Sequence, residues 1–333
     1  MWMLLATVTA AMLSAALIRI IRPLLLKHAL ARPNARSSHR LPTPQGAGIA
    51  VMAATLAVAG VIIVGVDTSG AHFPVAVFAA TLFIAAVGFA DDLRSMPIVT
   101  RLVLQASAVA AILLAAPADL RIVPAVPLWI ERGLLLFAGL WFVNLVNFMD
   151  GLDWMTAAEV VPITAALIVL GLTGAFPQSP SILAAALCGA MIGFAPFNRP
   201  IATIFLGDVG SLPIGLLLGW CLLQLAWHQQ ITASLLLPMY YLADATLTLL
   251  RRLARGEPFW TGHRSHFYQR ATDNGLSVIG VVRAVFLLNL VLAALAIAST
   301  QVKSSAIEVA LIVAGASAVA FLLHRFSRPH SLK

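Results

Sequence analysis

The chain has 333 residues, of which 61% are hydrophobic and only 10% are charged, and its mean hydropathy is +0.96. A soluble globular domain is about a quarter charged and about half apolar, so this composition excludes that class. The net charge of +8 would suit a nucleic acid ligand, but the basic residues lie between long apolar blocks rather than in a soluble domain.

Apolar blocks long enough to cross a bilayer recur along the whole chain. A spanning helix needs about 17–25 mainly apolar residues. The first block has no basic segment before it and no small-residue cleavage site after it, so we expect a retained helix rather than a signal peptide. The sequence predicts a single all-α polytopic membrane domain over 1–333, with about eleven spans: 2–21, 46–66, 72–90, 101–116, 128–148, 157–175, 181–197, 211–227, 231–250, 278–299 and 304–324.

The basic residues divide unequally between the two sets of alternating loops. One side holds 17 Lys and Arg and the other holds three, with Arg283 inside the tenth span. The positive-inside rule places the rich side in the cytoplasm, so the amino terminus is expected outside and the carboxyl terminus inside. Anionic lipid and anionic substrates are then better partners than nucleic acid. The cytoplasmic loops are expected at about 22–45, 91–100, 149–156, 198–210 and 251–277.

Acids and amides gather in the segments of the basic side. Ionisable groups at membrane depth are costly and usually mark a functional site. Asp91 and Asp92 are adjacent, so on a helix end they point about 100° apart and suit two separate tasks. Asn144, Asn147 and Asp150 share one helix face, since they are three residues apart. The other members of this cluster are Gly151, where the turn breaks, and Asp153 in the loop.

Carboxylates with amide oxygens, and without clustered Cys or His, favour a hard cation. We therefore expect Mg²⁺, or Mn²⁺ in its place, rather than Zn²⁺. Asp208 lies between Gly207 and the sequence Val-Gly-Ser at the start of the eighth span, where a helix amino terminus would favour phosphate oxygens. Basic residues and histidines before the second and tenth spans complete the charge pattern that a diphosphate needs. Among them are His39, His263, Arg264 and His266.

These motifs, in this order, resemble the polyprenyl-phosphate N-acetylhexosamine-1-phosphate transferases, which belong to glycosyltransferase family 4. The resemblance covers about 33–270. It rests on the stretch from Ser37 to Gly48, the pair Asp91-Asp92, the pattern N-x-x-N-x-x-D-G-x-D from Asn144, and F-x-G-D-x-G-S from Phe205. Asp244 and Arg252 stand where the family has the end of a helix resembling D-T-x-x-V-x-x-R-R.

The resemblance implies a reaction in which a UDP-sugar and undecaprenyl phosphate give undecaprenyl-diphospho-sugar and UMP, with Mg²⁺. The lipid phosphate attacks the β-phosphorus directly, because its oxygen is already ionised at pH 7. Phosphoryl transfer of this kind needs positioning and charge neutralisation. The residues implied are Asp91, Asp92, Asp208 and His266 for catalysis, Asn144, Asn147, Asp150, Gly151, Asp153, His39, His263 and Arg264 for substrate binding, and Asp208 and Asp150 for the metal.

The sequence also departs from the family pattern. The last cytoplasmic motif is often D-R-x-H-x-H-H, whereas here His263 replaces the acid, and Tyr268 and Gln269 replace histidines. This variant is similar to the branch that initiates O-antigen and related lipopolysaccharide or cell-wall polymers in the bacterial inner membrane. Trp154 stands where glycine is common, and Gln45 where a basic residue or methionine is common.

Other functions remain open at the level of sequence. A multi-span transporter would place acids near the bilayer midplane, often in repeated halves, and no internal repeat is visible. An aromatic prenyltransferase would need two N-D-x-x-D-like motifs. A catalytically inactive scaffold of the same fold would not need every motif acid. UDP-GlcNAc and rarer 6-deoxy-N-acetylhexosamines are all compatible donors, and a homodimer is an open option.

Overall fold

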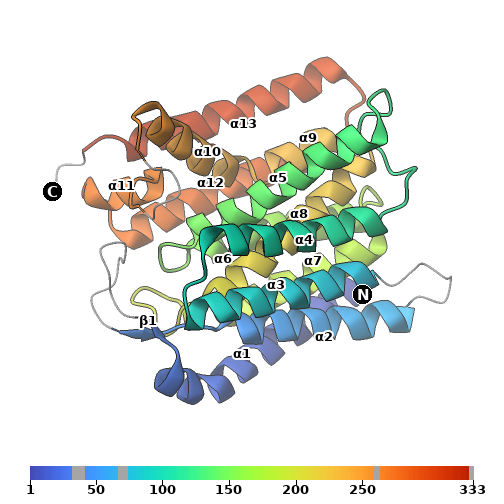
Figure 1. The fold of residues 1–333 in the computed structure, drawn as a ribbon. Helices are drawn as coiled ribbons and strands as arrows, with labels where there is room; N and C mark the ends of the chain where they lie inside the picture. The colour runs from blue at the N-terminus through green and yellow to red at the C-terminus, as the bar shows by residue number, and fades with distance from the viewer. Residues whose placement is uncertain (32–41, 67–73, 258–262, 330–333) are drawn as a thin grey trace.

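Long helices make up most of the computed structural model, which describes residues 1–31, 42–66, 74–257 and 263–329 (Figure 1). The helices lie side by side in one bundle, and two short strands lie at one end of it. In chain order the elements are α1 (Trp2–His28), β1 (Leu30–Ala31), β2 (Thr43–Pro44), α2 (Gly48–Val66), α3 (Val75–Leu93), α4 (Ile98–Ala115), α5 (Leu128–Met149), α6 (Met155–Leu172), α7 (Gln178–Phe194), α8 (Asp208–Trp227), α9 (Ile231–Leu236), α10 (Met239–Ala254), α11 (Phe267–Asp273), α12 (Val278–Ser299) and α13 (Ser305–Phe326).

The predicted all-α polytopic fold is confirmed. Within the described residues, nine helices are long and apolar enough to cross a membrane. α7 is apolar but has only 17 residues, and α9 and α10 together cover the remaining predicted span. The chain is therefore a multi-pass membrane protein.

Two predicted boundaries are wrong. The span expected at 231–250 is two helices, because Pro238 separates α9 from α10. Proline has no N–H to donate and its ring clashes with the preceding turn, so it starts a helix more readily than it continues one. α1 also continues to His28, so the loop expected from residue 22 begins later. Pro23 lies inside α1 without ending it.

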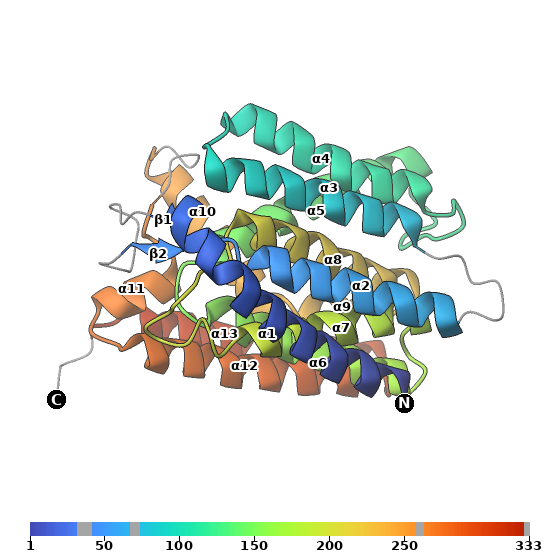
Figure 2. The same ribbon diagram turned by 90° about the horizontal axis from the view of Figure 1, so that it is seen from below.

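Consecutive long helices run in alternating directions, which brings the polar segments to one end of the bundle. α3, α5, α7 and α10 end there, and α2, α4, α6, α8 and α12 begin there, so we call it the site end. The amino terminus lies at the opposite end, and α13 brings the chain back to the site end (Figures 1 and 2).

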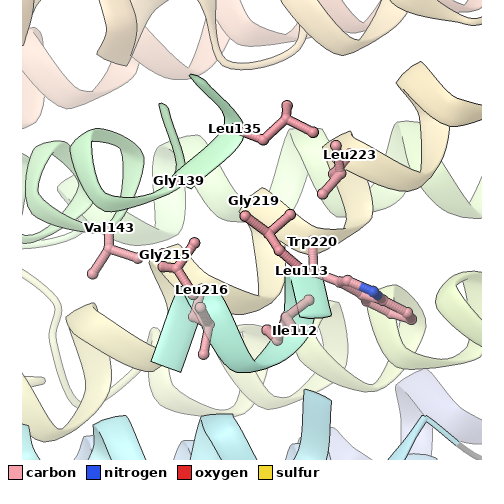
Figure 3. Close-up of a pocket in the computed structure, with 11 residues that line it drawn as sticks. Ile112, Leu113, Leu135, Gly139, Val143, Gly215, Leu216, Gly219, Trp220 and Leu223 are labelled. Atoms are coloured by element: carbon pink, nitrogen blue, oxygen red, sulfur yellow. The ribbon is translucent and has the colours of Figure 1, made fainter. Parts of the chain in front are cut away.

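α8 lies at the centre of the bundle, where it contacts α2, α3, α5, α7 and α9. Its contact with α5 depends on glycines, since a Cβ at Gly215 would lie 2.9 Å from the Cα of Val143. A cavity of about 40 Å³ remains where α4, α5 and α8 meet, and Figure 3 shows its apolar lining around Gly139, Gly215 and Gly219. This cavity belongs to helix packing, because it has no polar lining side chain other than the indole of Trp220.

The segment after β2 joins α1 to the start of α8. β1 pairs with β2 antiparallel, and Gln45 then forms a parallel bridge with Phe205. The amides of Gly46 and Ala47 donate to the carbonyl of Phe205, and the amide of Gly48 donates to that of Leu206. These bonds fix the segment 43–48 beside the first turn of α8.

Candidate active site

The first turn of α8 is capped by a carboxylate from another helix. Asp92, at the end of α3, accepts hydrogen bonds from the amides of Asp208 (2.9 Å) and Val209 (3.0 Å), one with each oxygen. The side chain of Gln45 also donates to Asp92. A carboxylate at a helix amino terminus satisfies unpaired N–H groups and interacts favourably with the helix dipole. Asp92 therefore fixes where α8, and with it Asp208, begins.

Glycines allow the backbones to come this close. A Cβ at Gly88, one turn before Asp92, would lie 2.3 Å from the carbonyl oxygen of Asp208. A Cβ at Gly48 would lie 2.3 Å from the Cα of Gly210. Gly207 has φ +78°, a conformation that L side chains rarely adopt. α2, α3 and α8 thus meet at backbone distance at the site end.

Asp91 has partners different from those of Asp92. Its carboxylate forms an ion pair with Arg101 of α4 (3.0 Å) and accepts from the amide of Met96. It also lies close enough to Asp208 for their carboxyl groups to interact. Adjacent residues on a helix point about 100° apart, so Asp91 forms its ion pair with α4 while Asp92 accepts from the amides of α8.

Asp208 is joined to α5 through Asn147. The amide of Asn147 donates to Asp208 (2.7 Å) and to the hydroxyl of Ser211 (2.9 Å). Asn144, on the same face of α5, is buried and donates to Gln105 of α4 (2.7 Å). The structure therefore brings Asn147 to the acids, whereas the amide of Asn144 bonds one turn away and joins two helices.

The loop between α5 and α6 carries the next two acids. Asp150 accepts a hydrogen bond from the hydroxyl of Thr156. Asp153 is buried and accepts from the amide of Ala202 (3.0 Å), in the segment before α8. Trp154, with φ +65°, donates its amide to Asn198 (2.7 Å). This loop is thus tied to the segment between α7 and α8.

The carboxyl group of Asp150 titrates well above its ordinary range. Desolvation raises the pKa of Asp150 from 3.8 to about 6, against the opposing effect of the hydrogen bond from Thr156. The charges of Asp92 and Asp153 raise the pKa further. Asp150 is thus a partly buried acid whose charged form is disfavoured by its surroundings.

A second cluster of polar residues surrounds Asp244, which lies near the middle of α10. The side chain of Asp244 has no exposed surface. Its carboxylate accepts from the amides of Phe267 (3.0 Å) and Tyr268 (3.1 Å), and so caps α11. It also lies 3.2 Å from Nδ1 of His266, a side chain that is only 3% exposed. Asp244 therefore holds His266 and α11 in place together.

α11 packs against the loop that carries Asp150. The hydroxyl of Tyr268 donates to the carbonyl of Phe148 (3.0 Å), and a Cβ at Gly151 would lie 2.1 Å from that hydroxyl. Gly151 is thus required by close approach rather than by an unusual φ angle. Tyr268 and Gln269, which replace histidines of the family pattern, are buried and support this loop.

The remaining predicted residues lie around His266 or outside the described chain. His263 stacks on His266 with 5.0 Å between the ring centroids. Arg264 forms an ion pair with Asp273 (3.2 Å), whose side chain is largely exposed. His39 lies outside the described residues.

The donor set fits a hard cation that also binds substrate phosphates. Within the described residues, no three His, Cys, Asp or Glu side chains are arranged to hold a metal by themselves. Mg²⁺ typically takes one or two carboxylates from the protein and its other ligands from water and phosphate. Asp208, in the first turn of α8, and Asp150, at the carboxyl-terminal end of α5, are the candidates to supply those carboxylates.

Sequence reasoning missed several supporting residues. Four of them form hydrogen bonds with Asp150, the backbone N–H of Trp154, Asn144 and Asp91; in that order they are Thr156, Asn198, Gln105 and Arg101. Each is an ordinary residue for a span or loop, so its sequence position gives no signal. Asp244 gave a signal, because it is an acid between apolar residues of a predicted span. Its contact with His266, however, requires the chain to fold back over 22 residues.

Comparison with known proteins gives one family and several relatives. The family model described as glycosyl transferase family 4 matches residues 74–226, which carry all of the acids discussed above except Asp244 and Asp273. The chain is 26% identical over 296 residues to the probable undecaprenyl-phosphate N-acetylglucosaminyl 1-phosphate transferase of Bacillus subtilis, a match that covers 86% of this chain and 80% of that protein.

Two further relatives match different lengths of the chain. The decaprenyl-phosphate N-acetylglucosaminephosphotransferase of Mycobacterium leprae is 27% identical over 299 residues, covering 78% of this chain and 74% of that protein. The phospho-N-acetylmuramoyl-pentapeptide-transferase of Chlamydia trachomatis is 38% identical, but only over 80 residues, or 23% of this chain and 24% of that protein.

Proposed function

Glycosyl transferase family 4, which the motifs predicted, is confirmed by the family model and the relatives, and from this premise we propose the donor and the course of the reaction. Like its relatives, the chain is a polyprenyl-phosphate sugar-1-phosphate transferase. The donor is a UDP-N-acetylhexosamine and the acceptor is undecaprenyl phosphate. The products are undecaprenyl-diphospho-sugar and UMP.

One observation carries this proposal: Asp92 and Asp208 meet Asn147 at one end of a membrane bundle, where Asp91 lies beside Asp92 on α3 and Asp150 ends α5. A transporter would be expected to hold its acids near the bilayer midplane. Here the acids lie at helix ends, where a nucleotide from water and a phosphate from the lipid surface can both arrive. This location favours transfer of a group from a water-soluble donor to a lipid acceptor over transport across the membrane.

The contacts suggest separate roles for the paired aspartates. Asp92 holds the first turn of α8 with both oxygens, so it positions Asp208 rather than meeting substrate. Asp91 holds Arg101, whose guanidinium is suited to the phosphate of the lipid acceptor. Asn147 orients Asp208, and His266, fixed by Asp244, borders the donor site.

Asp208 and Asp150 would hold Mg²⁺, or Mn²⁺, together with the diphosphate of the donor. The bound cation would offset the charge of the donor diphosphate and of the surrounding acids. An acceptor oxygen then forms a bond to the β-phosphorus while the bond from that phosphorus to the UMP oxygen breaks. One phosphoanhydride replaces another, so no other energy source is needed.

The site end would face the cytoplasm, where nucleotide sugars are available, in the inner membrane of a bacterium. The excess of basic residues on that side supports this orientation. The replacement of family histidines by Tyr268 and Gln269 supports a role in initiating O-antigen or another lipopolysaccharide or cell-envelope polysaccharide. N-acetylglucosamine is the first donor sugar to test, because it appears in the names of two relatives.

The proposal is tested with purified chain, undecaprenyl phosphate and a panel of UDP-sugars, with Mg²⁺ or with a chelator. We expect a diphospholipid product from one donor, lost with the chelator and with Asp208→Asn. Asp119→Asn, which changes an exposed acid at the other end of the bundle, is the matched control. UMP release without lipid product, or no product from any donor by folded protein, would count against the transferase.

A further inference from the structure

A groove of about 410 Å³ lies between α6, α7 and α12, apart from the acids. This volume is within the range of sites that hold small ligands. All of the lining residues except one are apolar, and the exception is Arg283 of α12. They are Trp154, Ala157, Ala158, Val161, Ile192, Ala195, Ile279, Val282, Arg283 and Phe286.

The groove lies at the site end of the bundle but does not reach the candidate active site. Trp154 precedes α6, Ala195 follows α7, and Ile279 is in the first turn of α12. The indole of Trp154 donates to the carbonyl of Ala195 (2.6 Å) and so spans the ends of α6 and α7. None of the candidate acids or histidines lines the groove, so its occupant would not be a reacting group.

Arg283 is exposed in the second turn of α12, one of the membrane-spanning helices. Among the described residues it makes no hydrogen bond or ion pair. A guanidinium at this depth is costly unless its side chain reaches an anionic partner at the membrane surface. Phosphate is such a partner, because it matches the planar donors of arginine.

We propose that this groove binds an anionic phospholipid of the bilayer, such as phosphatidylglycerol. Its phosphate contacts Arg283, and an acyl chain lies on the small side chains of Ala157 and Ala158 and on Ile192. A basic residue between spanning helices near the cytoplasmic surface favours anionic headgroups. Through Trp154 the lipid contacts the loop of Asp150 and Asp153. The proposal does not depend on the proposed transferase activity.

Trp154 provides a direct measure of occupancy. The full chain is placed in nanodiscs of phosphatidylcholine in which either phosphatidylglycerol or phosphatidylcholine carries brominated acyl chains. Bromine quenches the fluorescence of a nearby indole. The quenching that is seen in the wild type and is absent from Trp154→Phe therefore measures brominated lipid beside Trp154. We expect stronger quenching of Trp154 by the brominated phosphatidylglycerol. Arg283→Gln should weaken that lipid's binding about tenfold, and Arg94→Gln, an exposed arginine outside the groove, should not.

Equal quenching by the two brominated lipids, or unchanged quenching in Arg283→Gln, would overturn the proposal. Displacement of the brominated phosphatidylglycerol by an equimolar amount of undecaprenyl phosphate would assign the groove to the acceptor instead. Absence of quenching in a cross-linked dimer would show that a second copy covers the groove. Size-exclusion profiles and melting temperatures establish that each variant is folded.

Discussion

Asp92 and Asp208 lie together at the start of α8, yet their surroundings give them different tasks. Both oxygens of Asp92 accept from backbone amides, whereas Asp208 is held by the side chain of Asn147. A partly buried acceptor that bonds two backbone amides contributes to folding whether or not substrate is present. Asp92 therefore acts on the site through the position of α8.

Asp92→Asn is expected to destabilise the protein even without ligands. The amide group of asparagine turns one acceptor into a donor that faces a backbone N–H, which costs about 1–3 kcal/mol. The melting temperature in detergent should fall together with activity. Asp119→Asn should change neither, because Asp119 is an exposed residue distant from the site end. A Asp92→Asn variant with unchanged melting temperature would contradict the capping role.

The raised pKa of Asp150 predicts a pH-dependent stability in the absence of a cation. Between the ordinary pKa of 3.8 and about 6, the folded state binds more protons at Asp150 than the unfolded state does. The contribution of this group to stability is therefore complete below about pH 4 and is lost as the pH rises through about 6.

Asp150→Asn removes this titrating group, so the stability of the variant should not include its pH dependence. In chelator, the melting temperature of the variant minus that of the wild type should be larger at pH 8 than at pH 5, because only the wild type loses the contribution of Asp150 as the pH rises. Added Mg²⁺ should raise the melting temperature of the wild type at pH 8 and should have a smaller effect on the variant. A constant difference between the two proteins from pH 5 to pH 8 would refute the account of Asp150.

At the scale of elements, the site depends on how closely α3 and α8 approach. Gly88→Ala would place a methyl group 2.3 Å from the carbonyl of Asp208, which is backbone and cannot rotate away. Helix α8 must shift, at a cost of about 1–3 kcal/mol. We expect transferase activity and melting temperature to fall together.

Gly65→Ala is the matched control, because a Cβ at Gly65 meets no atom within 4 Å. It should leave activity unchanged. If Gly88→Ala kept full activity, the contact between α3 and α8 would not govern the position of Asp208.

Most helices were predictable from the sequence because each spanning block is apolar along its whole length. The starts of α2, α5, α8 and α12 and the ends of most helices fall within a few residues of the expected spans. The carboxyl-terminal end of α1 and the break before α10 were missed. Pro23 continues a helix and Pro238 separates two, and hydropathy alone does not distinguish these cases.

The candidate site was predictable as a set of acids on one side, since alternating spans bring alternate loops together. The partners of those acids were not predictable, because they depend on the packing of helices far apart in sequence. Asn144 shares a helix face with Asn147 but bonds to Gln105 of α4, one turn deeper. Asp244 reaches His266 only after the chain has folded back onto α10.

At the scale of the whole molecule, the proposed orientation predicts which ends of the helices are accessible. Cys188 and Cys221 are buried, so the native chain should react little with thiol reagents. Lys303 and Arg328 flank α13 and are both exposed. In intact cells, a membrane-impermeant maleimide should label Lys303→Cys and should label Arg328→Cys only after permeabilisation. The reverse pattern would invert the proposed orientation.

The most direct test of the transferase follows the β-phosphorus of the donor. The purified chain is given UDP-N-acetylglucosamine labelled at that phosphorus, or the donor found active in the panel, together with undecaprenyl phosphate. We expect the label to enter the lipid and unlabelled UMP to form in equal amount. Label that stays in water as UDP would indicate glycosyl transfer, and label in free sugar phosphate would indicate hydrolysis. Either result would contradict sugar-1-phosphate transfer.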